Sequence, residues 1–171
     1  EELDKEWDNS FKTTDTLLKM LAGKDIYTNS GPAFTLVGQS TGFTDFVPND
    51  GTIEQLKNSC GLRLLRKSRV TDSIMAYQRT IDRVLIKQAG MNEAQQYRNK
   101  ITELFDVSKI ITDTEFNDIP LLATDKKSIN SAFMYIVEWR NEFYLLKILG
   151  DNIKDCGSGL LKLIDEQYQI K

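Results

Sequence analysis

The chain has 171 residues, of which 40% are hydrophobic and 27% are charged, the balance of an ordinary globular domain rather than of a disordered chain. Its net charge of −3 argues against a nucleic-acid-binding surface, and its densest basic run, Arg63 to Arg69, is no larger than one solvated helix end. The chain contains no histidine, which excludes a Ser-His-Asp triad, a Cys-His dyad and a zinc site of the HExxH type.

The first part of the chain predicts a long helix, an ordered loop and a short helix. From 3 to 22, apolar residues recur at steps of three and four residues, and Gly23 then ends the pattern, so we expect an amphipathic helix over 3–22. Turn-forming residues are frequent in 25–51, although many apolar side chains lie between them. We therefore expect an ordered loop there, with short helical or extended pieces. Thr52 is a suitable N-cap for a short helix over 52–60.

Two further long helices are predicted in the rest of the chain. The clearest helical pattern covers 70–111, and Gly90 lies where its apolar stripe is weakest, so the helix is either continuous or interrupted at this glycine. A polar connector separates it from a last helix over 128–168. The run Gly157-Ser158-Gly159 inside that helix either breaks it or lets a neighbouring helix approach closely.

These elements predict an all-α fold. Two long helices joined by a short connector pack antiparallel, and the shorter helices complete the wall of a bundle. We therefore expect a single helical domain over 1–171: an elongated up-and-down bundle with two long antiparallel helices and a packed irregular loop.

The two cysteines, Cys60 and Cys156, match no metal-binding or redox spacing. They either form one disulfide that joins distant parts of the chain or remain two independent thiols. In the first case, closing a loop of this length would stabilise the domain by about 4 kcal/mol.

Acidic residues gather at two places without the spacing of a metal site. Glu138 and Glu142 lie one turn apart on the last predicted helix and are interpreted as a solvated face. Asp113, Glu115 and Asp118 lie in the connector, but the spacing of an EF-hand calcium loop is absent.

Aromatic residues are spread over the predicted helix faces, where they pack in a core or line a small pocket between helices. They are Trp7, Tyr77, Tyr97, Tyr135, Trp139 and Tyr144. No residue type in the chain occurs at the spacing of a known catalytic or cofactor motif. We therefore assign no catalytic, cofactor-binding or metal-ligating residue and expect no cofactor.

The stretch 49–77, with Leu56 to Leu65 and Asp72 to Tyr77 as its core, resembles a group of uncharacterised membrane-anchored proteins of Bacteroidetes. Those proteins have an N-terminal membrane helix followed by an extracytoplasmic helical region with a similar pattern. Cys60 before Gly61 departs from that pattern. The resemblance covers about a fifth of the chain and implies no activity. It does imply a membrane anchor upstream of Glu1 and a periplasmic location.

The sequence therefore leads us to expect a non-enzymatic, extracytoplasmic helical domain of a membrane-anchored protein, which binds a partner protein or senses a small molecule. One alternative is a cytoplasmic helical adaptor whose exposed stripe binds another helix. A histidine-free hydrolase or transferase is a further alternative. The identity of the ligand or partner and the oligomeric state are left open.

Overall fold

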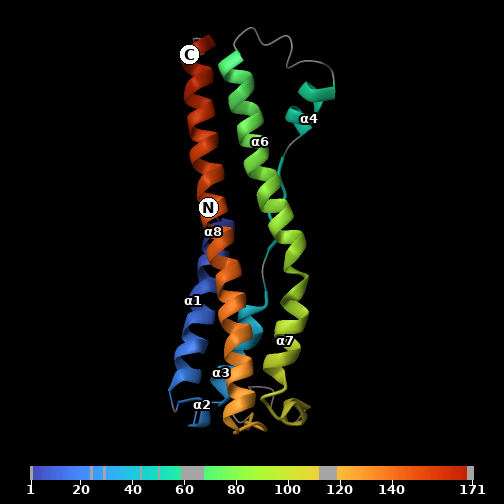
Figure 1. Cartoon of the computed structure of the whole chain (residues 1–171), viewed down its shortest axis with the longest axis vertical. Helices are drawn as coiled ribbons and strands as arrows, with labels where there is room; N and C mark the ends of the chain where they lie inside the picture. Colours follow the sequence, from blue (N-terminus) through green and yellow to red (C-terminus); the bar gives the residue numbers. More distant parts are fainter. Residues whose placement is uncertain are drawn as a thin grey trace. The chain divides into compact units, whose positions relative to one another are not determined.

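The computed structural model describes residues 2–23, 25–28, 30–42, 44–49, 51–58, 68–111 and 119–168, and it confirms the all-α prediction (Figure 1). Among these residues the only β interaction is an isolated antiparallel bridge between Phe105 and Leu121. The α-helices are α1 (Glu2–Ala22), α2 (Asp25–Thr28), α3 (Ser30–Ser40), α4 (Gly51–Asn58), α6 (Ser68–Ala89), α7 (Ala94–Thr102) and α8 (Lys126–Tyr168), and the 3-10 helices are η1 (Gly90–Glu93) and η2 (Val107–Ile111).

The chain folds into two compact units. Unit 1 comprises Glu1–Thr44 and Gly90–Leu145, and unit 2 comprises Asp45–Ala89 and Leu146–Lys171. The single domain expected over 1–171 thus contains two sets of helices, each with its own packing. Helix α8 contributes its first half to unit 1 and its second half to unit 2.

In unit 1, α1 and the first half of α8 run antiparallel. The ring of Phe11 lies 6.1 Å from that of Tyr144, and one turn later Asp15 lies 3.3 Å from Arg140. The buried face of α1 repeats at alternating steps of four and three residues, as in coiled coils, which explains why this stretch is helical and which face it buries. The residues of this face are Trp7, Ser10, Thr14, Leu17 and Leu21.

The ordered segment predicted over 25–51 contains short helical pieces, of which α3 is the longest. Pro32 lies in the first turn of an 11-residue helix, where proline is tolerated because the first backbone N–H groups have no partner within the helix. The buried face of α3 consists of small residues, Gly31, Ala33, Val37 and Ser40, which let it pack closely on α1. Of the residues that signal turns in the sequence, Gly31 therefore lies on the packed face of α3, whereas Pro32 and Gly38 are exposed.

The helix predicted over 70–111 is interrupted at Gly90, which is one of the two alternatives left open, and its end is corrected from Ile111 to Thr102. At Gly90 the backbone changes to the 3-10 segment η1, and α7 then ends at Thr102. The hydroxyl of Thr102 donates hydrogen bonds to the carbonyls of Arg98 and Asn99, and a tight turn follows. This turn buries Leu104 and Phe105, whose apolar side chains the sequence pattern assigned to one continuous helix.

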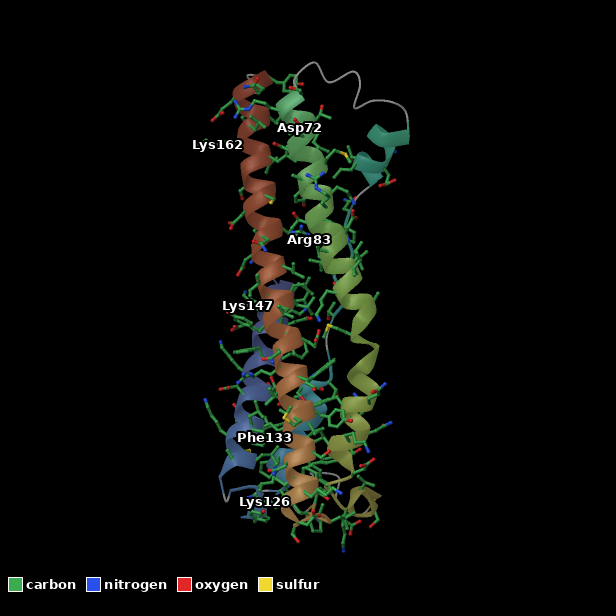
Figure 2. The ribbon with its side chains drawn as sticks, in the orientation of Figure 1. Asp72, Arg83, Lys126, Phe133, Lys147 and Lys162 are labelled. Carbon is green, nitrogen blue, oxygen red and sulfur yellow. The ribbon has the colours of Figure 1, made fainter. Side chains whose placement is uncertain are left out.

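In unit 2, α6 and the second half of α8 form an antiparallel pair. Tyr77 of α6 lies against Gly157 of α8. Three residues later on α6, the hydroxyl of Thr80 donates to the sulfur of Cys156, the residue before Gly157, at 3.7 Å. The two helices therefore run in opposite directions. Figure 2 shows Asp72 of α6 and Lys162 of α8 at the same end of this pair. The run Gly157-Ser158-Gly159 stays helical and allows the close approach, which was one of the two predicted alternatives.

Helix α8 keeps one heptad seam along its 43 residues, because its inward positions alternate at steps of three and four. In unit 1 the seam carries large side chains, Ile136, Trp139 and Phe143. In unit 2 it carries Leu146, Gly150, Ile153, Gly157, Leu160 and Ile164. The same pattern therefore serves a multi-helix core in one unit and a two-helix contact in the other.

Candidate binding groove in unit 1

A buried hydrogen-bonded aromatic stack lies where α3, α7 and α8 meet. The rings of Tyr97 and Trp139 are stacked, with centroids 5.4 Å apart and an interplanar angle of 17°. The Tyr97 hydroxyl and Ser40 Oγ are 2.9 Å apart, and Trp139 Nε1 donates to the Ser40 carbonyl at 2.7 Å. Both rings are 2% exposed, and this burial raises the pKa of Tyr97 to about 12.

The end of α3 explains why these groups come together. The last carbonyls of a helix have no partner within it, and Ser40 is the final residue of α3. The indole of Trp139 satisfies its carbonyl, while Arg98 donates to the Thr41 hydroxyl at 2.6 Å. The edge of Phe143 packs against Trp139 at 5.2 Å. Hydrogen bonds to Ser40 and the contact with Phe143 therefore hold the two stacked rings in place.

A groove of about 250 Å³ opens above this stack, between α7 and α8. Its floor is formed by Tyr97 and Trp139, and its walls by Tyr135, Glu138 and Glu142 of α8 together with Gln96 of α7. Tyr135 and Glu142 are half-buried, and Glu138 and Gln96 are exposed. A buried, hydrogen-bonded aromatic floor beside carboxylate and amide groups is a geometry for recognising a small polar ligand.

Arg140 lies between the two glutamates in sequence but is directed to the opposite side of α8. Its guanidinium lies 3.3 Å from Asp15 of α1 and 5.9 Å from the centroid of the Phe11 ring. Lys19, at 2.7 Å, and Arg140 lower the pKa of Asp15, with the hydrogen bond from Lys19 as the largest cause. The positive charge of Arg140 therefore stabilises the contact between α1 and α8.

The groove combines residues to which the sequence pattern assigns different roles. The pattern places Glu138 and Glu142 on a solvated face, and Tyr97, Tyr135 and Trp139 in a core or a pocket. The contributions of Ser40 and Gln96 were missed. An exposed glutamine and a serine at the end of an unrecognised helix carry no signal in the sequence.

The other predicted candidates lie elsewhere. Tyr144 contacts Phe11, Trp7 is buried in α1, and Tyr77 contacts α8 in unit 2. Cys156 is exposed on α8, whereas Cys60 falls outside the described residues, so the pairing of the two cysteines is not tested.

The acidic connector residues Asp113, Glu115 and Asp118 also fall outside the described residues. Within the described part of the chain, no three acidic, cysteine or histidine residues come close enough to hold a metal ion.

A second hollow, of about 350 Å³, lies beside the first turn of α8, between Lys100, Lys127 and Ser128 among others. The start of that helix is already capped, because Asp125 Oδ1 accepts from the Ser128 backbone N–H at 2.9 Å. Hydrogen bonds from Ser128 also lower the pKa of Asp125. An incoming anion would meet this carboxylate at the helix N-terminus, so we favour the groove above the aromatic stack.

No protein-family model, no curated protein and no solved structure matches the chain. In the described ranges, no helix combines the length and the apolar character needed to cross a bilayer.

Proposed function

We propose that this chain is a non-enzymatic helical domain that senses a small ligand through the groove of unit 1, and that it does so outside the cytoplasm as part of a membrane-anchored protein. The observation that carries the proposal is the groove itself, with carboxylate and amide groups beside an aromatic floor that buried hydrogen bonds hold in place. A preformed floor favours binding because little side-chain order remains to be gained when the ligand enters.

The polar groups of the stack support binding rather than catalysis. Ser40 Oγ is fully buried and hydrogen-bonded to Val37 and Tyr97, so it does not face the groove as a nucleophile. Tyr97, with its raised pKa, stays protonated at neutral pH and cannot act as a general base there. These groups hold helices together instead.

The proposed location rests on the resemblance of 49–77 to membrane-anchored extracytoplasmic proteins. It is tested by expressing the full-length gene and exposing intact spheroplasts to protease. Cleavage of the domain without lysis, with the protein in the membrane fraction, is the expected result. Protection from protease until lysis would contradict the extracytoplasmic proposal.

Binding is tested by a thermal-shift screen of the domain against a broad panel of small molecules. A ligand at one hundred times its dissociation constant stabilises the folded state by about 2.7 kcal/mol, which raises the melting temperature measurably. The variant Gln96→Trp fills the groove from an exposed position and is expected to abolish the shift. Asn141→Trp, at an exposed amide of α8 outside the groove, is the matched control and is expected to retain it.

A second candidate function, the cytoplasmic helical adaptor, is favoured by one observation. Met134, Tyr144 and Leu145 of α8 are large apolar side chains that are 58%, 53% and 43% exposed. If these side chains bind a partner helix, Leu145→Asp abolishes a complex that the unmodified domain retains in cytosolic extracts. A flat ligand screen together with such a complex would replace the sensing proposal.

A further inference from the structure

We infer that residues 45–49 of unit 2 form a strap that Gln88 holds on α6, and that this strap opens while α6 and α8 stay folded. Opening uncovers the face of α6 that carries Ile81. The inference concerns unit 2 alone and goes beyond the proposed ligand groove, which lies in unit 1. Three observations carry it: the hydrogen bonds of Gln88, the exposure of the strap and the arrangement of residues around α6.

The side-chain amide of Gln88 binds the backbone of the strap at two points. Its Oε1 accepts a hydrogen bond from the N–H of Phe46 at 3.0 Å, and its Nε2 donates to the Phe46 carbonyl at 3.4 Å. Nε2 also donates to the carboxylate of Asp45 at 3.3 Å. One side chain therefore pairs with both backbone groups of Phe46, as a residue of a neighbouring antiparallel strand would.

The strap has little else to hold it. In the described ranges, no backbone-to-backbone hydrogen bond joins 45–49 to another segment, and Pro48 has no N–H to donate. Val47 is 82% exposed, and Phe46 and Pro48 are only half-buried, so the strap contains no fully buried residue. Segments with few buried contacts open locally at free energies well below that of global unfolding.

Helix α6 is held much more firmly than the strap. Its backbone is helical from Ser68 to Ala89, and it contacts α8 through Tyr77 and Thr80. Six of its residues are buried, namely Val70, Ile74, Gln78, Thr80, Ile81 and Val84. Exposing the helix therefore costs more free energy than exposing the strap, so the strap opens first.

The faces of α6 indicate what the strap covers. Val84 follows Tyr77 by seven residues and Thr80 by four, so it lies on the face that contacts α8. Ile81 precedes Gln88 by seven residues, or two turns, so these two side chains share a neighbouring face. Figure 1 shows the chain continuing from the strap to α4 alongside α6. The strap therefore covers the face of Ile81 rather than the contact with α8.

The first test is amide hydrogen exchange of the whole domain, followed by NMR at Phe46 and Val84. In Gln88→Ala, the amide of Phe46 is expected to exchange at least tenfold faster, which corresponds to about 1.4 kcal/mol less free energy of opening. The amide of Val84 is expected to stay within twofold of its original rate. Arg83→Ala, which removes an exposed side chain of the same helix, is the matched control and is expected to leave both rates within twofold.

The second test asks whether opening uncovers Ile81. With both native cysteines replaced by serine, Ile81→Cys and Val84→Cys each place one thiol at a buried position, 3% and 0% exposed in the unmodified domain. Labelling by a thiol reagent is measured for each and divided by the rate in urea. We expect Ile81→Cys to be labelled at least tenfold faster than Val84→Cys. Adding Gln88→Ala is expected to accelerate only the labelling of Ile81→Cys, at least fivefold, and circular dichroism checks that each variant is folded.

Several results would overturn the inference. A Phe46 amide that exchanges at the same rate in the unmodified domain and in Gln88→Ala would show that Gln88 does not hold the strap. Acceleration of the Val84 amide as strong as that of Phe46, or an equal effect of Arg83→Ala, would mean that the variants destabilise α6 as a whole. Labelling of Ile81→Cys that matches Val84→Cys, or that Gln88→Ala leaves unchanged, would show that the strap does not cover Ile81.

Discussion

Units 1 and 2 use the same heptad pattern in different ways. In unit 1 the seam of α8 carries Trp139 and Phe143, which are 2% and 0% exposed because α1, α3 and α7 contribute to the same core. In unit 2 the seam carries Gly150 and Gly157, and from Asp151 to Tyr168 α8 has no fully buried residue. Large side chains need several helices around them, whereas glycine suits the close approach of two.

The comparison shows where a specific site can form. A core built from several helices has buried ends and carbonyls that need partners, and in unit 1 the hydrogen bond from Trp139 to Ser40 meets that need. The same hydrogen bond fixes the position of the Trp139 ring, above which the groove opens. In unit 2, α6 buries apolar residues such as Val70, Ile81 and Val84, but its partner α8 has no fully buried residue from Asp151 to Tyr168. Unit 1 is therefore the part of the chain in which we place ligand binding.

The largest expected effect comes from removing a buried ring of unit 1. Phe143→Ala leaves a cavity next to Trp139 and is expected to destabilise unit 1 by about 3–5 kcal/mol. Ile153→Ala, at a half-buried seam position of unit 2, is expected to cost less. Both tryptophans lie in unit 1, so urea unfolding followed by tryptophan fluorescence reports the loss of stability caused by Phe143→Ala. Equal losses for the two variants, measured by hydrogen exchange in each unit, would remove the distinction between the units.

The second effect is a loss of stability at high pH that depends on Tyr97. An unfolded tyrosine ionises near pH 10, whereas burial raises the pKa of Tyr97 to about 12. The contribution of the neutral Tyr97 side chain to the free energy of unfolding is therefore fully present below pH 10. It falls as pH rises from 10 to 12, by about 3 kcal/mol in total. Urea midpoints measured over this range should fall more steeply for the unmodified domain than for Tyr97→Phe. Identical slopes would mean that this hydroxyl is accessible to water.

A third, smaller effect tests the closure of α3 by Trp139. Trp139→Phe keeps an aromatic ring but leaves the buried Ser40 carbonyl without its indole donor, which is expected to cost about 1–3 kcal/mol. Trp7 then remains as the fluorescence probe of unit 1. As a control, Trp7→Phe changes a buried indole whose Nε1 has no hydrogen-bond partner among the described residues, so its cost should be lower. The reverse order would show that the hydrogen bond to Ser40 contributes little.

The smallest effect sharpens the description of unit 2. In Gly159→Ala the new Cβ meets no atom within 4 Å in the described part of the chain, and the change is expected to stabilise α8 by about 1 kcal/mol through helix propensity. Gly157→Ala would place its Cβ 3.3 Å from the Tyr77 ring, so part of the same gain is lost in moving that ring. Thermal unfolding followed by circular dichroism should rank Gly159→Ala above Gly157→Ala. Equal gains would mean that the two helices do not approach closely at Gly157.

The fold could be predicted from the sequence where one helix face carries a long regular repeat. This holds for α1 and for α8, whose seams continue through many turns. It does not locate α3 within the predicted ordered loop, because the small buried residues of α3 also occur in turns. It fails at the end of α7, because Leu104 and Phe105 fit a helical stripe although they pack in a turn. In both places tertiary packing decides between conformations that the local sequence allows.

The candidate site was less accessible from the sequence. The pattern shows that Glu138 and Glu142 share a face of α8, but it does not show which helix faces them or that Arg140 turns away to Asp15. Ser40 and Gln96 gain their roles only through neighbours that are distant in sequence. A groove between helices depends on those neighbours, so it became visible only in the folded chain.

The most direct test of the account is the paired thermal-shift screen of the unmodified domain and its Gln96→Trp variant, read by tryptophan fluorescence from unit 1. The account predicts at least one compound that raises the melting temperature of the unmodified domain in a dose-dependent way and has no effect on the variant. A compound that stabilises both proteins equally would place binding outside the groove, and a screen with no shift in either protein would contradict the sensing function.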